Sequence, residues 1–309
     1  GIEEFGTIFA FILLIDLLFR PLRQIADKFN TLQMGMVAAN RVFKILDTDS
    51  NIQDVGTVVK EDIKGNISFS NVRFGYLEDE EVLHGISFEV KAGETVAIVG
   101  ATGAGKSTII NLLNRFYEIN SGVILVDGID IKDYSLASLR KRIAVVLQDV
   151  FLFAVTIANN ISLNDNEVTI ALIEKAAKQI GVDEFISSLP EGYQYNVKGR
   201  GTMLSSDQRQ LIAFLRADVS NPSILVLDEA TSSVDTYSEQ LIQRATEKIT
   251  EGRTSIIIAH RLATIKKADK IIVMDAGKIV EQGTHKELIK KGGYYSNLYE
   301  AQFLAEEVA

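Results

Sequence analysis

A glycine-rich segment places the strongest constraint on the fold of this 309-residue chain. It reads Gly100-Ala101-Thr102-Gly103-Ala104-Gly105-Lys106-Ser107-Thr108, follows the apolar run Thr95–Val99 and opens a helical pattern. Strand, glycine turn and helix together are the setting of a P-loop, whose backbone N–H groups face an anion near the positive end of the helix. The segment predicts an α/β fold that binds the phosphates of a nucleotide. Lys106 is expected to reach the β and γ phosphates, and the Ser107 hydroxyl to coordinate Mg²⁺.

Short apolar strands alternate with helical stretches from Asn66 onward, which indicates an α/β sheet with a mostly parallel centre. The strands are predicted at Thr95–Val99, Val123–Val126, Ile143–Leu147, Ile224–Leu227, Ser255–Ile258 and Lys270–Val273. Helices are predicted at Ser107–Tyr117 and Asp235–Thr250, and Thr284 with Glu287 forms a capping box that starts a late helix. Val150–Ala217 shows helices and loops without a strand, so it is predicted to be a helical insertion between two core strands.

The N-terminus has a different pattern. Phe5–Phe19 is apolar except for Thr7 and Asp16, and Arg20 and Arg23 follow it. The run is shorter than the roughly 20 residues that span a bilayer, but basic residues after it favour a cytoplasmic exit from a membrane. A buried core helix and a secretory signal are the alternatives, although a signal would have a basic flank before the run.

A narrow apolar seam continues from this run along one predicted helix. Its members are spaced by three and four residues, as in helices that pack against other helices. They are Leu22, Ile25, Phe29, Leu32, Met36, Ala39, Phe43 and Leu46. The polar stretch Asp47–Gly65 is predicted to be a linker. The chain is therefore divided into residues 1–46, the linker 47–65 and a domain over 66–309, whose helical subdomain covers about 150–217.

Composition excludes several classes of protein. The net charge is −9 and no basic block stands out, which argues against nucleic acid as a partner. The chain has no cysteine, so disulfides and thiolate metal sites are impossible. A hydrophobic content of 47% is enough to build a globular core.

Further polar residues stand at the ends of predicted strands. Asp228 and Glu229 follow Ile224–Leu227, Gln148 follows Ile143–Leu147, and His260 closes the next strand. Ligands collect at the carboxyl ends of parallel strands, and an acidic pair after an apolar strand is a costly place for charge without a metal. These residues are therefore candidates for the same site.

The order of these segments resembles the ATP-binding-cassette (ABC) family over the chain from about Asn66 to its end. The segments that carry the resemblance are Phe74-Gly75-Tyr76, the P-loop, Gln148, Leu204-Ser205-Ser206-Asp207-Gln208, Asp228-Glu229, Ser233-Val234-Asp235 and His260. The N-terminal helix looks like the last membrane helix of exporters in that family. The match resembles one subunit of a heterodimeric multidrug-type exporter from a thermophilic bacterium.

The resemblance implies a role for each of these residues. Tyr76 would stack on adenine, Gln148 would bind Mg²⁺ and sense the membrane domain, and Asp228 would hold the Mg²⁺ shell. Glu229 would be the general base and His260 would contact the γ-phosphate. Asp235 would communicate across a cassette dimer. The resemblance thus implies an ATPase at the cytoplasmic side of the plasma membrane, driving export with ATP and Mg²⁺. The expected fold is a P-loop core with an antiparallel β portion near residues 66–95 and a helical subdomain near 150–217.

The signature segment departs from the family's usual Leu-Ser-Gly-Gly-Gln. Ser206 and Asp207 replace both glycines, while Ser205 and Gln208 still form a capping box. In the family this helix end faces the γ-phosphate held by the opposite subunit. Ser206 adds a Cβ at this position. Asp207 adds a negative charge, whose repulsion from the phosphate is on the order of 3 kcal/mol per phosphate charge at about 5 Å and an effective dielectric constant of about 20. Exporters also usually carry Glu where Gly199 stands, so contact with the partner's membrane domain is expected to be altered.

The signature is altered while Lys106, Glu229 and His260 are intact, and this difference predicts a heterodimer. The partner would supply an intact signature to the site that contains Lys106, Glu229 and His260, and the opposite site would be degenerate. The apolar segment Phe151–Phe153 is expected to dock the membrane domain. Three alternatives stay open: a DNA-repair or chromosome-organising ATPase, a regulatory cassette without turnover, and an importer cassette.

Overall fold

The computed structural model describes residues 2–48, 52–77, 79–201, 203–229 and 236–302, in two compact units that divide between Gln53 and Asp54. The first unit contains α1 (Ile2–Leu46), a single helix of 45 residues whose described side chains are exposed. Among the described residues, α1 is the one helix that is long and apolar enough to cross a membrane. The predicted helix is therefore present, and it runs without interruption through Pro21.

The second unit contains two sheets. The antiparallel sheet has the order β2-β1-β4-β5, and the larger sheet has the order β10-β9-β3-β8-β7-β6. The smaller sheet consists of β1 (Ile67–Leu77), β2 (Glu80–Val90), β4 (Ser121–Val126) and β5 (Ile129–Asp130). The larger consists of β3 (Thr95–Gly100), β6 (Ile143–Val146), β7 (Ile224–Asp228), β8 (Thr254–Ile258), β9 (Lys270–Asp275) and β10 (Lys278–Gly283).

The larger sheet is parallel except for its edge strand β10, so the predicted parallel centre is confirmed. The strand predicted at Val123–Val126 is present as β4, but it pairs antiparallel with β1 and belongs to the smaller sheet. Hydrophobic periodicity detects a strand but does not reveal its partner.

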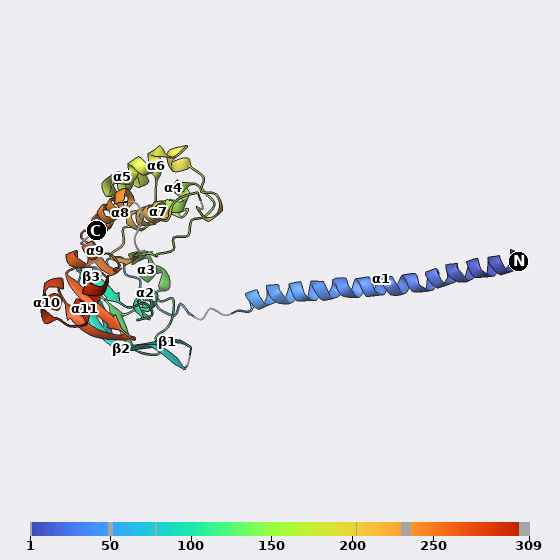
Figure 1. Ribbon diagram of the computed structural model, residues 1–309, viewed down its shortest axis with the longest axis horizontal. Helices are drawn as coiled ribbons and strands as arrows, with labels where there is room; N and C mark the ends of the chain where they lie inside the picture. Colours follow the sequence, from blue (N-terminus) through green and yellow to red (C-terminus); the bar gives the residue numbers. More distant parts are fainter. Residues whose placement is uncertain (1, 49–51, 78, 202, 230–235, 303–309) are drawn as a thin grey trace. The chain divides into compact units, whose positions relative to one another are not determined.

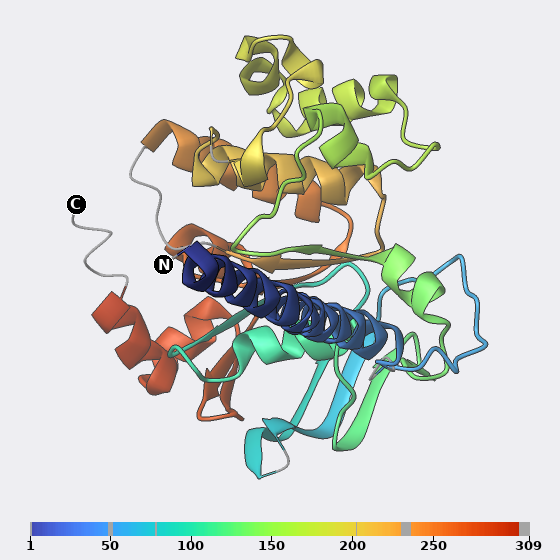
Figure 2. The ribbon, with the colours of Figure 1, turned by 90° about the vertical axis from the view of Figure 1, so that its right-hand side faces the viewer.

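The helices of the second unit complete the α/β fold. They are α2 (Lys106–Leu113), α3 (Leu136–Arg142), α4 (Ile157–Ser162), α5 (Ile170–Ile180), α6 (Asp183–Ser188), α7 (Ser206–Val219), α8 (Thr236–Thr250), α9 (Leu262–Lys267), α10 (His285–Lys291) and α11 (Tyr294–Gln302), with short 3-10 turns η1 (Gly192–Gln194) and η2 (Gly199–Gly201). The elements α4 to α7 lie between β6 and β7, as predicted, and Figures 1 and 2 show them at the end of the unit opposite β1 and β2. The helix predicted to reach Tyr117 ends at Leu113, because Arg115 adopts a left-handed backbone with φ 51°.

The central strands are buried on both faces. Along β3, Val96 and Ile98 pack into a core shared with the antiparallel sheet and α2. Ala97 and Val99 point the other way, into a core shared with the helical insertion. Alternation with a period of two therefore joins both halves of the domain through one sheet, which is typical of parallel sheets.

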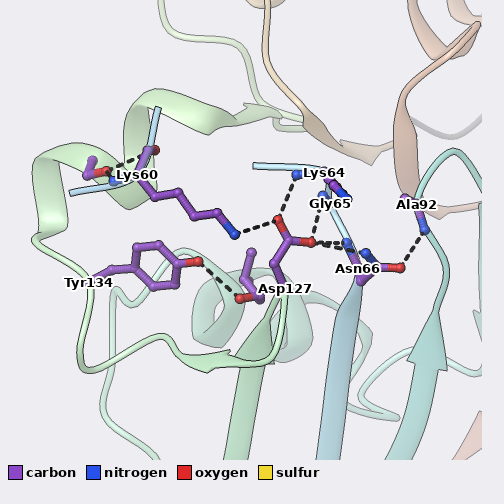
Figure 3. A network of polar contacts seen from close by, with 9 residues as sticks. Lys60, Lys64, Gly65, Asn66, Ala92, Asp127 and Tyr134 are labelled. Carbon is purple, nitrogen blue, oxygen red and sulfur yellow. Dashed lines mark hydrogen bonds and ion pairs between the residues drawn. The ribbon is translucent and has the colours of Figure 1, made fainter. Parts of the chain in front are cut away.

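A group of polar contacts around Asp127, here called the Asp127 clasp, fixes the segment that enters the domain (Figure 3). Asp127 lies in the β4–β5 turn and accepts hydrogen bonds from the backbone N–H groups of Lys64 (2.6 Å), Gly65 (3.1 Å) and Asn66 (2.9 Å). The Lys60 ammonium lies 3.6 Å from the same carboxylate. The structure thus includes residues 54–65 in the second unit, held against the β4–β5 turn.

Candidate nucleotide-binding site

The glycine-rich loop joins β3 to α2, as the sequence predicts. Gly105 stands at the start of α2 with φ 95°, and a Cβ on it would lie 2.8 Å from the Leu83 side chain. A Cβ on Gly100 would lie 2.2 Å from the carbonyl oxygen of Met274. Glycine is required at both positions, and the resulting tight loop leaves backbone N–H groups at the start of a helix free to face an anion.

Lys106 begins α2 and is almost fully buried at 8% exposure. Its ammonium donates to the carbonyl oxygens of Gly100 (2.7 Å) and Ala101 (2.9 Å). Burial lowers the pKa of Lys106, and the nearby Asp228 carboxylate partly offsets this effect. The loop therefore holds a desolvated cation next to its own backbone, where a phosphate can compete for it.

Oxygen donors for a metal meet beside this lysine. The Ser107 hydroxyl donates to Asp228 across 3.5 Å, and Gln148 lines the same pocket. Burial raises the pKa of Asp228, while Ser107 and Lys106 counteract the shift. No cluster of three His, Cys, Asp or Glu side chains forms in the part of the chain that the structure describes. Hydroxyl, carboxylate and amide oxygens suit Mg²⁺, which prefers few protein ligands completed by water and phosphates.

Most of the candidate residues line one pocket of about 510 Å³, within the range of small-molecule sites. Its lining consists of Tyr76, Val82, Thr102, Gly103, Gly105, Lys106, Ser107, Thr108, Gln148, Asp228, Ile258 and His260. The pocket extends from an exposed aromatic side chain, past the glycine loop, to the carboxyl ends of the parallel strands. This extended arrangement suits a ligand with a ring at one end and phosphates at the other.

Tyr76 lies at the aromatic end with 46% of its surface exposed. Its ring makes edge contacts with Phe74 and Tyr117, whose centroids lie 4.9 and 5.0 Å away. Its hydroxyl contacts Thr108 (3.3 Å) and accepts a hydrogen bond from Asn111 (3.1 Å). The sequence analysis did not identify Asn111 or Tyr117. Asn111 lies three residues after Thr108 on α2, and Tyr117 lies just beyond the end of that helix; this proximity to the P-loop was the only signal in the sequence.

Glu229 differs from its neighbour Asp228. It is 5% exposed and is not among the described residues that line the pocket. It accepts hydrogen bonds from the Thr264 hydroxyl (2.6 Å) and from the backbone N–H groups of His260 (3.2 Å) and Arg261 (3.3 Å). Burial raises the pKa of Glu229, and these donors counteract the shift. His260 thus lines the pocket, and the Glu229 carboxylate lies outside the described lining, bonded to the backbone of His260. Nothing in the sequence pattern indicated Thr264.

His260 is half-buried in the same pocket. Burial lowers its pKa, and the positive charge of Lys106 lowers it further. Both effects favour the neutral ring, which can donate a hydrogen bond from one nitrogen and accept one at the other.

The signature segment forms the start of α7. Ser205 caps the helix, and both bonds of the capping box with Gln208 are present, at 3.1 and 3.0 Å, so the predicted cap is confirmed. Ser206 is exposed and Asp207 half-buried, and none of Ser205 to Gln208 lines the pocket. Asp235 lies outside the described residues. In the segment after Gln148, Leu152 is buried, while Phe151 and Phe153 are each 51% exposed with ring centroids 5.1 Å apart.

Comparison with known proteins agrees with this geometry. The family model described as ABC transporter matches residues 83–232. A solved structure of a bacterial Atm1-family ABC exporter with ATP bound is 42% identical, superposes with a TM-score of 0.78, and is matched over 93% of this chain and 50% of its own. The chain contains an ABC transporter ATP-binding domain. It has the P-loop ABC ATPase fold, preceded by a long N-terminal helix.

The ABC chain is also similar to several longer bacterial proteins. YknV of Bacillus subtilis, an uncharacterized ABC transporter ATP-binding protein, is 46% identical over 96% of this chain and 50% of its own length. YheH of the same organism, a probable multidrug resistance ATP-binding/permease protein, is 45% identical over 98% of this chain and 45% of its own. A fatty acid ABC transporter ATP-binding/permease protein of Mycobacterium bovis is 47% identical over 96% of this chain and 47% of its own length. The chain thus spans about half the length of these relatives.

Proposed function

We propose that this ABC domain binds ATP with Mg²⁺ and hydrolyses it to drive export across a membrane, from the cytoplasmic side of the plasma membrane. The observation that carries the proposal is the single pocket that joins Tyr76, the glycine loop, Asp228 and His260. Relatives that carry both ATP-binding and permease functions, and the apolar helix α1, support the link to a membrane. The exposed pair Phe151 and Phe153 is the proposed contact for the membrane domain. The thermophilic source expected from the sequence stays a prediction.

In this proposal each group has a defined task. Tyr76 stacks on adenine, and the glycine loop with Lys106 holds the phosphates. Ser107, Gln148 and Asp228 would hold Mg²⁺, which supplies charge neutralisation on the phosphate oxygens. Glu229 takes the proton of a water whose oxygen attacks the γ-phosphorus in line, and the bond from the γ-phosphorus to the bridging oxygen breaks to leave ADP. His260 contacts the γ-phosphate.

A tryptophan at position 76 tests nucleotide binding. The chain contains no tryptophan, so Tyr76→Trp carries a single reporter in the pocket. We expect ATP to quench its fluorescence in a saturable manner, because adenine stacks on the indole, and Lys106→Ala in this background to raise the Kd at least tenfold. Tyr195→Trp is the matched control, since Tyr195 packs against the core of the helical insertion and is not part of the described lining. A folded Tyr76→Trp protein without a saturable signal would argue against adenine at this position.

We further propose that the working protein is a heterodimer with a degenerate second site. The support is chemical: Asp207 would bring a carboxylate, and Ser206 a side chain, to a helix end that the family resemblance places opposite a phosphate. The intact capping box shows that the helix start itself is well formed, so any defect lies in the phosphate contact. The partner's signature would complete the site that contains Lys106, Glu229 and His260.

Restoring both glycines tests this idea. We expect Ser206→Gly with Asp207→Gly to raise ATP hydrolysis by the chain alone at least tenfold, because a charge and a Cβ are removed from the phosphate contact. Asp207→Asn, which removes only the charge, should give a smaller rise. Measured rates equal to that of the parent chain would mean that the signature is competent, and the argument for a heterodimer would fail.

A further inference from the structure

We infer that Thr264 is a positioning residue that stores the Glu229 carboxylate outside the phosphate pocket until the site is ready for hydrolysis. The inference rests on the proposed role of Glu229 as the general base. It deepens that role, because it identifies what controls the base. We call the contact between the Thr264 hydroxyl and Glu229 the storage contact.

The backbone of Glu229 is anchored to the neighbouring strand. Its N–H donates to the carbonyl oxygen of Ile258 at 3.1 Å, which continues the pairing of β7 with β8. Successive side chains along a strand point to opposite faces. Asp228 therefore faces the P-loop, and Glu229 faces the start of α9. A water at the γ-phosphate comes within reach of Glu229 only after its side chain turns.

The stored carboxylate is well satisfied where it lies. Three donors reach it: the backbone N–H groups of His260 and Arg261, which lie between β8 and α9, and the hydroxyl of Thr264 within α9, which is the closest at 2.6 Å. The side chain is 5% exposed, so water cannot replace a lost donor. The buried Arg261 side chain adds favourable electrostatics. Leaving this position therefore has a cost, and the Thr264 hydroxyl is the one side-chain donor of the three.

The storage contact is also linked to the pocket. His260 lines the pocket, while its backbone N–H binds Glu229. The same short segment thus senses the pocket and holds the base. A shift of His260 toward a γ-phosphate weakens the backbone contacts, and the Thr264 hydroxyl is then the main remaining restraint.

The test is Thr264→Val, which keeps the shape of threonine and removes its hydroxyl. We expect kcat for ATP hydrolysis by the full chain, mixed with a cassette that has an intact Leu-Ser-Gly-Gly-Gln signature, to rise on the order of tenfold, with KM for ATP unchanged within twofold. Thr264→Ser keeps the donor and should hydrolyse at the parent rate. In the Glu229→Gln background, Thr264→Val should have no effect, because the restraint acts through the carboxylate.

Matched controls separate this role from a structural one. Thr246 is a buried threonine whose hydroxyl binds the carbonyl oxygen of Ile242, so Thr246→Val measures the general cost of removing a buried hydroxyl. If Thr264→Val does not fold, the smaller Thr264→Ala replaces it. A kcat that is unchanged or lower would overturn the inference, as would a rise that persists with Glu229→Gln. If Glu229→Gln itself hydrolyses ATP at the parent rate, the proposed catalytic role fails instead.

Discussion

Glu229→Gln is expected to lower ATP hydrolysis by about 10²- to 10⁴-fold while ATP binding is retained. The amide keeps the shape of the side chain and can still accept from Thr264, but it cannot take a proton from water. The measurement is steady-state hydrolysis by the chain alone and mixed with a cassette that carries an intact signature. We expect weak activity alone, a strong rise on mixing, and loss of that rise in the variant.

Glu247→Gln is the matched control for this substitution. Glu247 is an exposed carboxylate on α8 that pairs with Lys267 and lies outside the nucleotide pocket, so its change should leave the rate within twofold. A Glu229→Gln protein as fast as the parent would remove Glu229 from the mechanism. Tight ATP binding without hydrolysis in any mixture would favour the regulatory cassette. In that alternative, bound ATP holds the subunits together and is not hydrolysed.

The sequence predicts the strand, loop and helix around Lys106 well, because the residues there are constrained by backbone geometry. The glycines of the loop are needed for φ values and close contacts that other residues do not tolerate, so their pattern identifies a strand, a loop and a helix together. Asp228, Gln148 and His260 follow from one rule, that parallel strands present their carboxyl ends at one edge. Once the strands are known to be parallel, this rule alone predicts that the three side chains meet in one pocket.

Other features depend on contacts between distant segments, and no local pattern encodes them. Strand β4 has the same apolar character as the parallel strands, yet it pairs with β1 in the other sheet. Thr264 is an ordinary threonine in a short helix until the fold places its hydroxyl against Glu229. The residues before β1 were predicted to be a linker because they are polar, but their backbone N–H groups find an acceptor in Asp127, more than 60 positions later. Polarity indicates exposure, and it does not reveal such a partner.

Asp127→Asn is expected to destabilise the second unit by about 2–3 kcal/mol at neutral pH. The carboxylate accepts three backbone N–H groups and is 5% exposed as a side chain. An asparagine turns one of its two acceptors into a donor that faces an N–H group, and hydrogen bonds to a charged group are worth roughly 1.5–3 kcal/mol. The substitution keeps a residue type that tolerates the left-handed backbone of position 127, φ 50°, so backbone strain does not contribute. Thermal or urea unfolding measures the loss. The control is Asp130→Asn, three residues along the chain in β5, where the carboxylate accepts a backbone N–H from Lys132 (2.9 Å).

The loss should also depend on pH in a defined direction. Burial alone raises the pKa of Asp127, but the hydrogen bonds from Asn66 and Lys64 and the charge of Lys60 outweigh it, so the pKa lies below its usual value. A carboxylate with a lowered pKa stabilises the fold fully above its unfolded pKa of about 3.9, and this stability disappears as the pH falls through the folded value. The difference between parent and Asp127→Asn should therefore be constant above about pH 5 and shrink below about pH 4. If the difference in unfolding free energy between the two proteins stays constant in acid, the charge of Asp127 does not hold the entering segment, and the geometry of its side chain does.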